Sequence, residues 1–210
     1  PSIVDDTHIV GPLNQVIPAF TSFTQHLRTI GLSVKSSKCC VWSPRGLPVD
    51  FSPPEGMSTP IGLRILGAPF GSSTYMSDFI RDALHEKSRH ATLLAQIGDP
   101  QVAFWILCDC FTQRPSYITR TCPPTPILRM LLEGFDRSMM EVLERLIGPG
   151  SFADGEAYLP CREASLPTTF GGTGILSTVS TMTCAYLGAW ALVAHSISSR
   201  FIVSDRPILL

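Results

Sequence analysis

The opening part of the chain alternates short apolar segments with polar turns, a pattern that predicts β-hairpins around one helix. Residues 2–10 are rich in Ile and Val on either side of Asp5 and Asp6, which predicts a tight hairpin with the acidic pair at its tip. Apolar residues then recur at helical spacing over residues 14–30, and Gly31 is a natural end for that helix.

Beyond this helix the pattern predicts two more strand pairs and then a change to helices. Residues 32–42 are expected to form a strand, a polar turn and a second strand, and residues 63–72 a short hairpin punctuated by Gly and Pro. Helical spacing of apolar residues predicts helices over residues 77–97, 100–111, 126–147 and 177–198. We therefore expect an α+β chain with two domains, residues 1–76 and 77–210, whose boundary lies near Ser72–Ser77.

Composition limits the classes of function that are open to the chain. The sequence is 44% hydrophobic and 16% charged, so it can form a substantial core and is not a disordered tail. Its formal net charge of −1 provides no global attraction for nucleic acid or anionic membranes, so contacts of that kind require local patches. The seven cysteines include no Cys-x-x-Cys pair, which argues against a zinc ribbon and favours reduced thiols in an intracellular protein.

One long stretch lacks ionised side chains and raises the question of a membrane span. Residues 166–199 contain no Asp, Glu, Lys or Arg, and residues 174–197 are mostly apolar. Several Ser and Thr residues and His195 dilute the apolar run. We therefore favour a buried helix of a soluble core over a span and expect no membrane partner.

The sharpest candidate for chemistry is the neighbouring pair Asp5 and Asp6. Adjacent side chains of a regular strand point to opposite faces, so two neighbouring carboxylates converge on one ion only at a turn. Hard cations such as Mg²⁺ prefer oxygen ligands and often share them with phosphates. An exposed acidic turn is the simpler interpretation, and the dipeptide alone favours it.

The order of motifs changes that balance, because it resembles the palm of reverse transcriptases of non-LTR, LINE-like retroelements. The acidic hairpin corresponds to the third palm motif of that family, with Ile3 where an aromatic residue is usual. Residues 31–32 and Lys38 match the fourth motif, although Lys35 stands where Asn is common. Residues 66–71 match the Leu-Gly-x-Pro-x-Gly pattern of the fifth motif.

The resemblance continues downstream into the segment that follows the thumb in this family. The matching residues are Leu166 and Pro167, Gly171 to Ile175, Ala185 to Leu187, and Ala189 with Trp190. Residues 73–155 match only in helical character. The fold implied is the end of a polymerase palm, over residues 1–76, followed by a helical region like a thumb, over residues 77–210.

The resemblance also implies roles for individual residues. Asp5 and Asp6 would bind Mg²⁺ or Mn²⁺, and Lys38 would approach the phosphates of the incoming dNTP. The primer end would be held by a hairpin made of Leu66, Gly67, Ala68, Pro69, Phe70 and Gly71. The partners would be an RNA template and a DNA primer, and the hairpin would lie beside the acidic pair.

The family pattern includes parts that these 210 residues do not contain. A further essential Asp belongs to an earlier palm strand, and the fingers that grip the template precede it. We therefore expect a fragment of an RNA-directed DNA polymerase from a retrotransposon that is inactive on its own.

Two other classes of protein remain open. One is a helical protein-interaction protein with an incidental Asp-Asp turn, and the other is a small membrane protein anchored by residues 174–197. Basic residues form two groups that are either phosphate contacts or ordinary solvated faces. They are Lys35, Lys38 and Arg45, and separately Lys87, Arg89 and His90.

Overall fold

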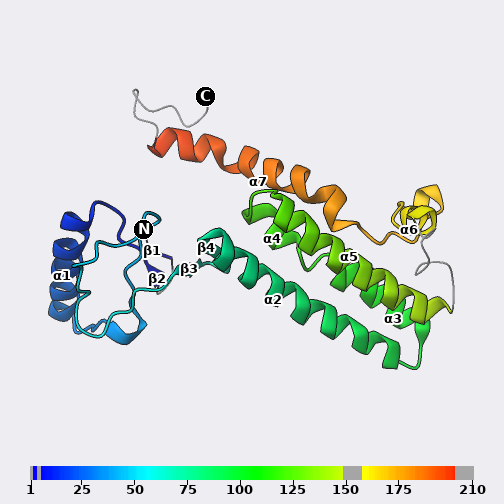
Figure 1. The fold of residues 1–210 in the computed structure, drawn as a ribbon, viewed down its shortest axis with the longest axis horizontal. Coiled ribbons are helices and arrows are strands. Elements are labelled where there is room, and N and C mark those ends of the chain that lie inside the picture. The colour runs from blue at the N-terminus through cyan, green and yellow to red at the C-terminus, as the bar shows by residue number, and fades with distance from the viewer. Residues whose placement is uncertain (1, 4–5, 149–157, 202–210) are drawn as a thin grey trace. The chain divides into compact units, whose positions relative to one another are not determined.

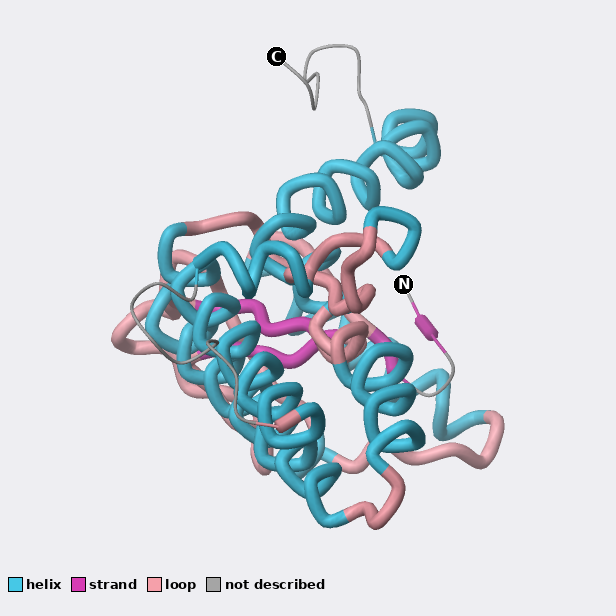
Figure 2. The backbone as a smooth tube through the Cα atoms, turned by 90° about the vertical axis from the view of Figure 1, so that its right-hand side faces the viewer, coloured by secondary structure: helices cyan, strands magenta, loops and turns pink. Residues whose placement is uncertain are grey.

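The computed structural model describes residues 2–3, 6–148 and 158–201. By their internal contacts the residues group into two compact units, a first unit of residues 1–61 and a second unit of residues 62–210. Figure 1 labels the elements of both units, and Figure 2 shows how little strand accompanies the helices. The described structure is mixed α and β and mostly helical, which confirms the coarse fold class.

The predicted N-terminal hairpin is present in the first unit. Strand β1 (Ser2–Ile3) pairs antiparallel with strand β2 (Asp6–Thr7), and Ile3 stands opposite Asp6. The backbone of Asp6 therefore belongs to the second strand rather than to the tip of the hairpin. Asp5 lies outside the described residues.

Helix α1 (Leu13–Thr29) confirms the first predicted helix and ends at the expected glycine. Gly31 is left-handed, with φ of 79°. This conformation lets the Leu32 amide donate to the Leu27 carbonyl at 3.0 Å. The bond satisfies a carbonyl that the end of the helix would otherwise leave unpaired.

The first unit has little core of its own. None of the side chains of α1 is fully buried, although its apolar face is partly covered. Among residues 7–61, whose side chains are described, only Val41 is buried. Local hydrogen bonds and partial burial therefore hold this unit together, rather than a packed interior.

The strand pair predicted for residues 32–42 is wrong. The turn tightens into the 3-10 helix η1 (Ser36–Lys38), in which the Lys38 amide donates to a carbonyl three residues earlier at 2.9 Å. Cys40 then forms an isolated parallel bridge with Ser58. The pattern identified an extended segment there, but its partner comes from a distant loop rather than from the preceding residues.

The second unit opens with the hairpin predicted for residues 63–72. Strand β3 (Gly62–Ile65) pairs antiparallel with strand β4 (Ala68–Gly71) through a two-residue connection. The second strand packs against the helix that follows. The contacts of the hairpin therefore place it in the second unit, together with the helices.

Two long helices of the second unit, α2 and α5, begin at capping hydroxyls. Helix α2 (Ser73–Thr92) starts four residues before its predicted position, because the Ser72 hydroxyl accepts a hydrogen bond from the amide three residues later, at 3.2 Å. Helix α5 (Pro126–Ile147) starts as predicted after Thr125, whose hydroxyl accepts from the Leu128 amide at 3.1 Å. Helices α2 and α5 lie side by side (Figure 1).

Shorter elements complete the described structure. They are η2 (Leu93–Gln96), α3 (Pro100–Ile106), the π-helical turn η3 (Leu107–Phe111), α4 (Ser116–Thr121), α6 (Tyr158–Ala164), η4 (Thr168–Phe170) and α7 (Thr178–Phe201). Together α3 and η3 cover the helix predicted for residues 100–111, and α7 matches the last predicted helix. Helices α4 and α6 were not predicted, because their 6 and 7 residues are too few for helical periodicity to be visible.

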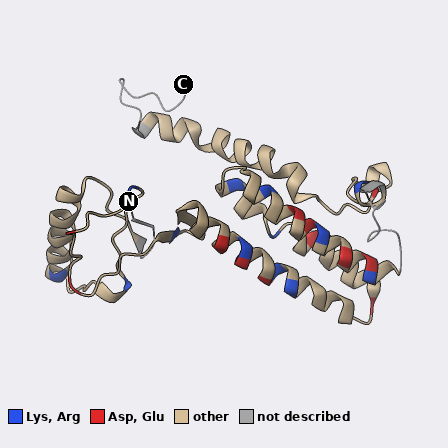
Figure 3. Cartoon of the chain, viewed as in Figure 1, with Lys and Arg blue, Asp and Glu red and all other residues tan. Residues whose placement is uncertain are grey.

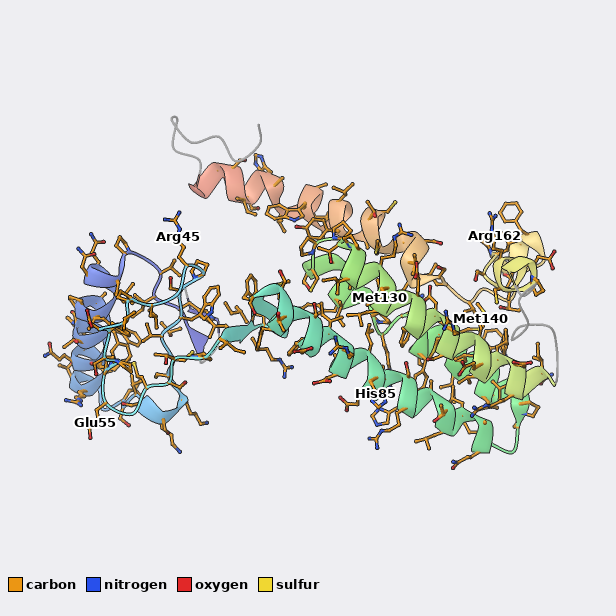
Figure 4. The ribbon with its side chains drawn as sticks, viewed as in Figure 1. Arg45, Glu55, His85, Met130, Met140 and Arg162 are labelled. Carbon is orange, nitrogen blue, oxygen red and sulfur yellow. The ribbon has the colours of Figure 1, made fainter. Side chains whose placement is uncertain are left out.

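The hydrophobic core of the second unit is centred on α5, which packs against α2, α3 and α7. Met140 is buried while Met130 is exposed, so α5 is amphipathic; both are labelled in Figure 4. The other buried side chains of this helix are Leu128, Leu132, Phe135, Met139, Val142 and Leu143.

Asp136 of α5 caps the start of α7. Its carboxylate accepts from the Thr178 hydroxyl at 2.6 Å, the Thr178 amide at 3.1 Å, the Ser177 hydroxyl at 2.9 Å and the Val179 amide at 3.3 Å. The first amides of a helix have no partner within it, so a side chain from another helix supplies the acceptor. Burial raises the pKa of the Asp136 carboxyl, and the hydrogen bonds from Thr178, Ser177 and Val179 offset part of that increase.

Helix α7 is buried only near its beginning. Met182 belongs to the core, whereas Leu187 and Leu192 are 60% and 85% exposed, so the expectation of a buried helix holds for its first turns alone. Figure 3 shows it without Lys, Arg, Asp or Glu along residues 178–199. Within the described ranges, no helix has both the length and the apolar content required to span a bilayer.

We predict that Asp136→Ala lowers the free energy of unfolding by about 2–3 kcal/mol, because it removes the acceptor from the first amides of α7. Urea unfolding followed by circular dichroism measures the change. Asp78→Ala is the matched control, because Asp78 pairs only with Arg81 on the exposed face of α2 and should cost within about 0.5 kcal/mol. Equal effects of the two substitutions would contradict the capping role.

A pH dependence follows from the raised pKa of Asp136. The folded chain holds this proton more tightly than the unfolded chain does, so the stability from this group is complete below its ordinary pKa of 3.8. It is lost as the pH rises through the raised value. The difference in unfolding free energy between the wild type and Asp136→Asn should therefore change with pH across this window. A difference independent of pH would refute this assignment.

Candidate functional site

Only one of the two expected metal ligands falls among the described residues. Asp6 lies in strand β2, while Asp5 lies outside the described part of the chain. In residues 2–3, 6–148 and 158–201, no group of three or more His, Cys, Asp or Glu residues is placed to hold a metal ion. The carboxylate pair with Mg²⁺ or Mn²⁺ therefore remains a prediction.

Lys38 lies at the end of η1 with its side chain exposed. Lys35 and Arg45 are exposed as well, and Figure 4 shows Arg45 pointing away from the ribbon of the first unit. The three cations thus face solvent, as expected for an ordinary surface or for a surface that meets phosphates on binding. A role for Lys38 with a nucleotide stays a prediction.

The hairpin over residues 62–71 is the best-defined of the predicted site elements. Its connecting residues Leu66 and Gly67 both have positive φ, 50° and 87°. Positive φ at both positions gives the two-residue turn that matches the right-handed twist of paired strands. Leucine seldom adopts this conformation, so other contacts must hold the turn in place.

Tyr117 of α4 provides such a contact from 51 residues away. Its hydroxyl donates a hydrogen bond to the Leu66 carbonyl at the turn. Its ring also packs on the turn, since a Cβ added to Gly67 would lie 3.4 Å from the nearest ring carbon. The hairpin tip is therefore attached to the helical region at a defined point.

The other end of the hairpin packs closely on α2. A Cβ at Gly62 would lie 2.3 Å from the ring of Tyr75, so only glycine allows this approach. Ala68 and Pro69 are buried, and the guanidinium of Arg64 lies 5.9 Å from the centre of the Phe79 ring. These contacts leave the hairpin rigid at its base.

The exposed side chains of the hairpin are two apolar residues, Leu66 and Phe70, and one arginine, Arg64. Leu66 is 54% and Phe70 is 46% exposed, and Arg64 is the only charged residue in 62–71. A site with no carboxylate, imidazole or thiol cannot itself transfer a proton. Its chemistry is that of a binding surface, which presents backbone groups and apolar side chains to a partner.

The cysteines do not form a second candidate centre. Burial, with a smaller contribution from Asp109, raises the pKa of the Cys108 thiol to about 11, so it stays protonated at neutral pH. Burial also raises the pKa of Cys122, which lies in the core. Cys108 is therefore suited to packing rather than to metal binding or nucleophilic attack, while Cys110 is exposed.

Sequence reasoning missed Tyr117 and Asp136, which connect distant elements of the second unit. Neither belongs to a motif, and their partners lie 51 and 41–43 residues away. No local pattern in the sequence signals either contact, because both partners lie far away along the chain.

We predict that Tyr117→Phe weakens the hairpin without unfolding the chain. Loss of one hydrogen bond should lower the local opening free energy by about 1 kcal/mol, so amides of residues 62–71 should exchange with solvent roughly fivefold faster. Hydrogen exchange measured by NMR checks this. Tyr186→Phe is the control, because the described residues offer its hydroxyl no hydrogen bond. Unchanged amide protection in Tyr117→Phe would show that the hydrogen bond from Tyr117 to Leu66 does not support the hairpin.

Comparisons with models of protein families, with curated proteins and with solved structures found no match for this chain. The features from which a function can be proposed are therefore its own: the acidic pair, the braced hairpin and the helices that support it.

Proposed function

We propose that the chain is the end of a reverse-transcriptase palm followed by a helical region like a thumb. In the complete polymerase it would take part in RNA-directed DNA synthesis by two-metal nucleotidyl transfer. The proposal rests on the order of motifs in the sequence, from the acidic pair to residues 66–71. This function is the one that the arrangement of residues supports best.

The observation that carries the proposal is the hairpin of strands β3 and β4. Residues 66–71 were predicted to form a hairpin for gripping a primer, and a hairpin with an exposed apolar tip is found there. The turn presents the Leu66 side chain, which is 54% exposed, while the Tyr117 ring covers Gly67. Helices follow it directly from Ser73, in the order that a thumb would require.

The proposal assigns the chemistry to a few side chains. Asp5 and Asp6 would hold divalent cations, which in such enzymes stabilise charge on the transferring phosphoryl group. Lys38 would contact the phosphates of the bound nucleotide. The tip of the hairpin would position the primer end by backbone and apolar contacts, a positioning task that does not require an ionisable group.

The metal-binding part of the proposal is testable on the 210-residue chain by amide NMR with Mn²⁺. Paramagnetic broadening should appear first at Ile3, Asp6 and Thr7 and should be lost in Asp5→Ala and in Asp6→Ala.

Asp50→Ala is the matched control, because it removes an exposed carboxylate of the first unit that has no proposed role. It should leave the broadening unchanged. Broadening that survives both Asp5→Ala and Asp6→Ala would reject the metal site and favour an incidental acidic turn. Extension of a primer by this chain alone with Mg²⁺ would show that the predicted third carboxylate and the fingers are not needed.

A further inference from the structure

Helix α7 continues past the part of the second unit that covers it. A groove of about 350 Å³ lies between α4 and α7, and the residues of α7 that line it are Thr178, Thr181, Cys184 and Ala185. Met182 is the last buried side chain of the helix, because residues 183–199 are all half-buried or exposed. Figures 1 and 2 show the second half of α7 projecting beyond α4 and α5. The core therefore supports only the beginning of this helix.

The side of α7 that faces the core continues as an apolar stripe beyond the end of the core. Thr178 and Met182 are buried, and the positions that follow them at alternating steps of three and four residues lie on the same side of the helix. These positions are Ala185, Ala189 and Leu192. The two alanines are half-buried, but Leu192 is 85% exposed, and Val193 beside it is 46% exposed. The stripe that packs inward at the start of α7 is thus uncovered further along.

The lack of charge in this segment limits the kind of partner that can cover the stripe. Residues 166–199 contain no Asp, Glu, Lys or Arg, so they offer nothing to attract an acidic or a basic surface (Figure 3). They also lack the basic residues by which surface-bound helices are held on anionic lipid. A second copy of the same stripe fits, because two uncharged apolar surfaces meet without repulsion and without burying an unpaired charge.

The position of the core selects an antiparallel arrangement of two such helices. The core of the second unit lies at the beginning of α7, so two cores stay apart only when the helices run in opposite directions and overlap by their free halves. The free half, residues 185–199, is about 22 Å long. Leu192 is its middle residue and therefore lies near the two-fold axis. The small side chains of Ala185 and Ala189 let the helices approach closely.

The exposed apolar area is that of a weak, reversible contact. Leu192, Val193 and the flanking Trp190 are 85%, 46% and 42% exposed. Large apolar side chains offer roughly 150–250 Å² each, so these three present roughly 300 Å² in each copy. Stable interfaces bury roughly 800 Å² per partner, and smaller ones are typical of transient complexes. We therefore expect a dimer that forms at micromolar protein concentrations.

We propose that α7 joins two copies of this chain into an antiparallel pair through the stripe formed by Ala185, Ala189, Leu192 and Val193. The pair goes beyond the proposed function and does not rest on it. It involves neither the acidic pair nor Lys38 nor the hairpin over residues 62–71.

Sedimentation equilibrium of the whole 210-residue chain tests this inference. The weight-average mass should rise from 22.9 kDa towards twice that value as the protein concentration increases from about 1 to about 200 μM. Leu192→Gln should weaken the association at least about tenfold, because it places a polar amide in the middle of the apolar contact.

Leu187→Gln is the matched control on the same helix. Leu187 is 60% exposed, but it lies five residues before Leu192 and therefore about 140° around the helix from it. This substitution should change the association constant less than about twofold. Both leucines are exposed in the single chain, so at about 1 μM both variants should unfold within about 2 °C of the wild type.

Four results would overturn the proposal. They are a mass of 22.9 kDa at every concentration, equal effects of Leu192→Gln and Leu187→Gln, a mass that grows past two copies, and retention on phosphatidylcholine vesicles by a chain that stays monomeric. None of these results changes the Mn²⁺ experiment on Asp5 and Asp6. Failure of the helix pair and failure of the proposed function are therefore observed separately.

Discussion

The arrangement of the second unit depends on one buried carboxylate and the helix start that it satisfies. Asp136 projects from the central helix α5 and accepts the unpaired amides and hydroxyls at the beginning of α7. Residues 166–199 have no charges of their own to orient them, so this cap, the burial of Met182 and the packing of α7 on α4 together determine where α7 lies. Because α7 forms one wall of the groove beside α4, the same cap also shapes that groove.

The two units are stabilised in different ways, and this difference decides where a defined surface can exist. The second unit has a continuous core, and the hairpin is held at its base by Tyr75 and at its tip by Tyr117. In the first unit only Val41 is buried among residues 7–61. A binding surface needs rigid support to keep its geometry, so the braced hairpin offers a better defined site than the acidic strand of the first unit.

Patterns that depend on neighbouring residues predicted the structure well, and those that depend on distant partners did not. The cap at Thr125 and the left-handed Gly31 are visible in the sequence because their partners lie within a few residues. The bridge between Cys40 and Ser58 and the bond from Tyr117 to Leu66 have no such local signature. For the site, the hairpin at residues 66–71 was therefore predictable, whereas its contact with Tyr117 was not.

The conformation of Leu66 connects these observations. A leucine at φ of 50° is unfavourable by about 1–3 kcal/mol on its own, so the turn persists only where its surroundings compensate. The Tyr117 hydroxyl supplies one hydrogen bond at that carbonyl, and the ring covers Gly67. One side chain of α4 therefore contacts both residues of the turn, so the conformation of the hairpin tip depends on where α4 lies.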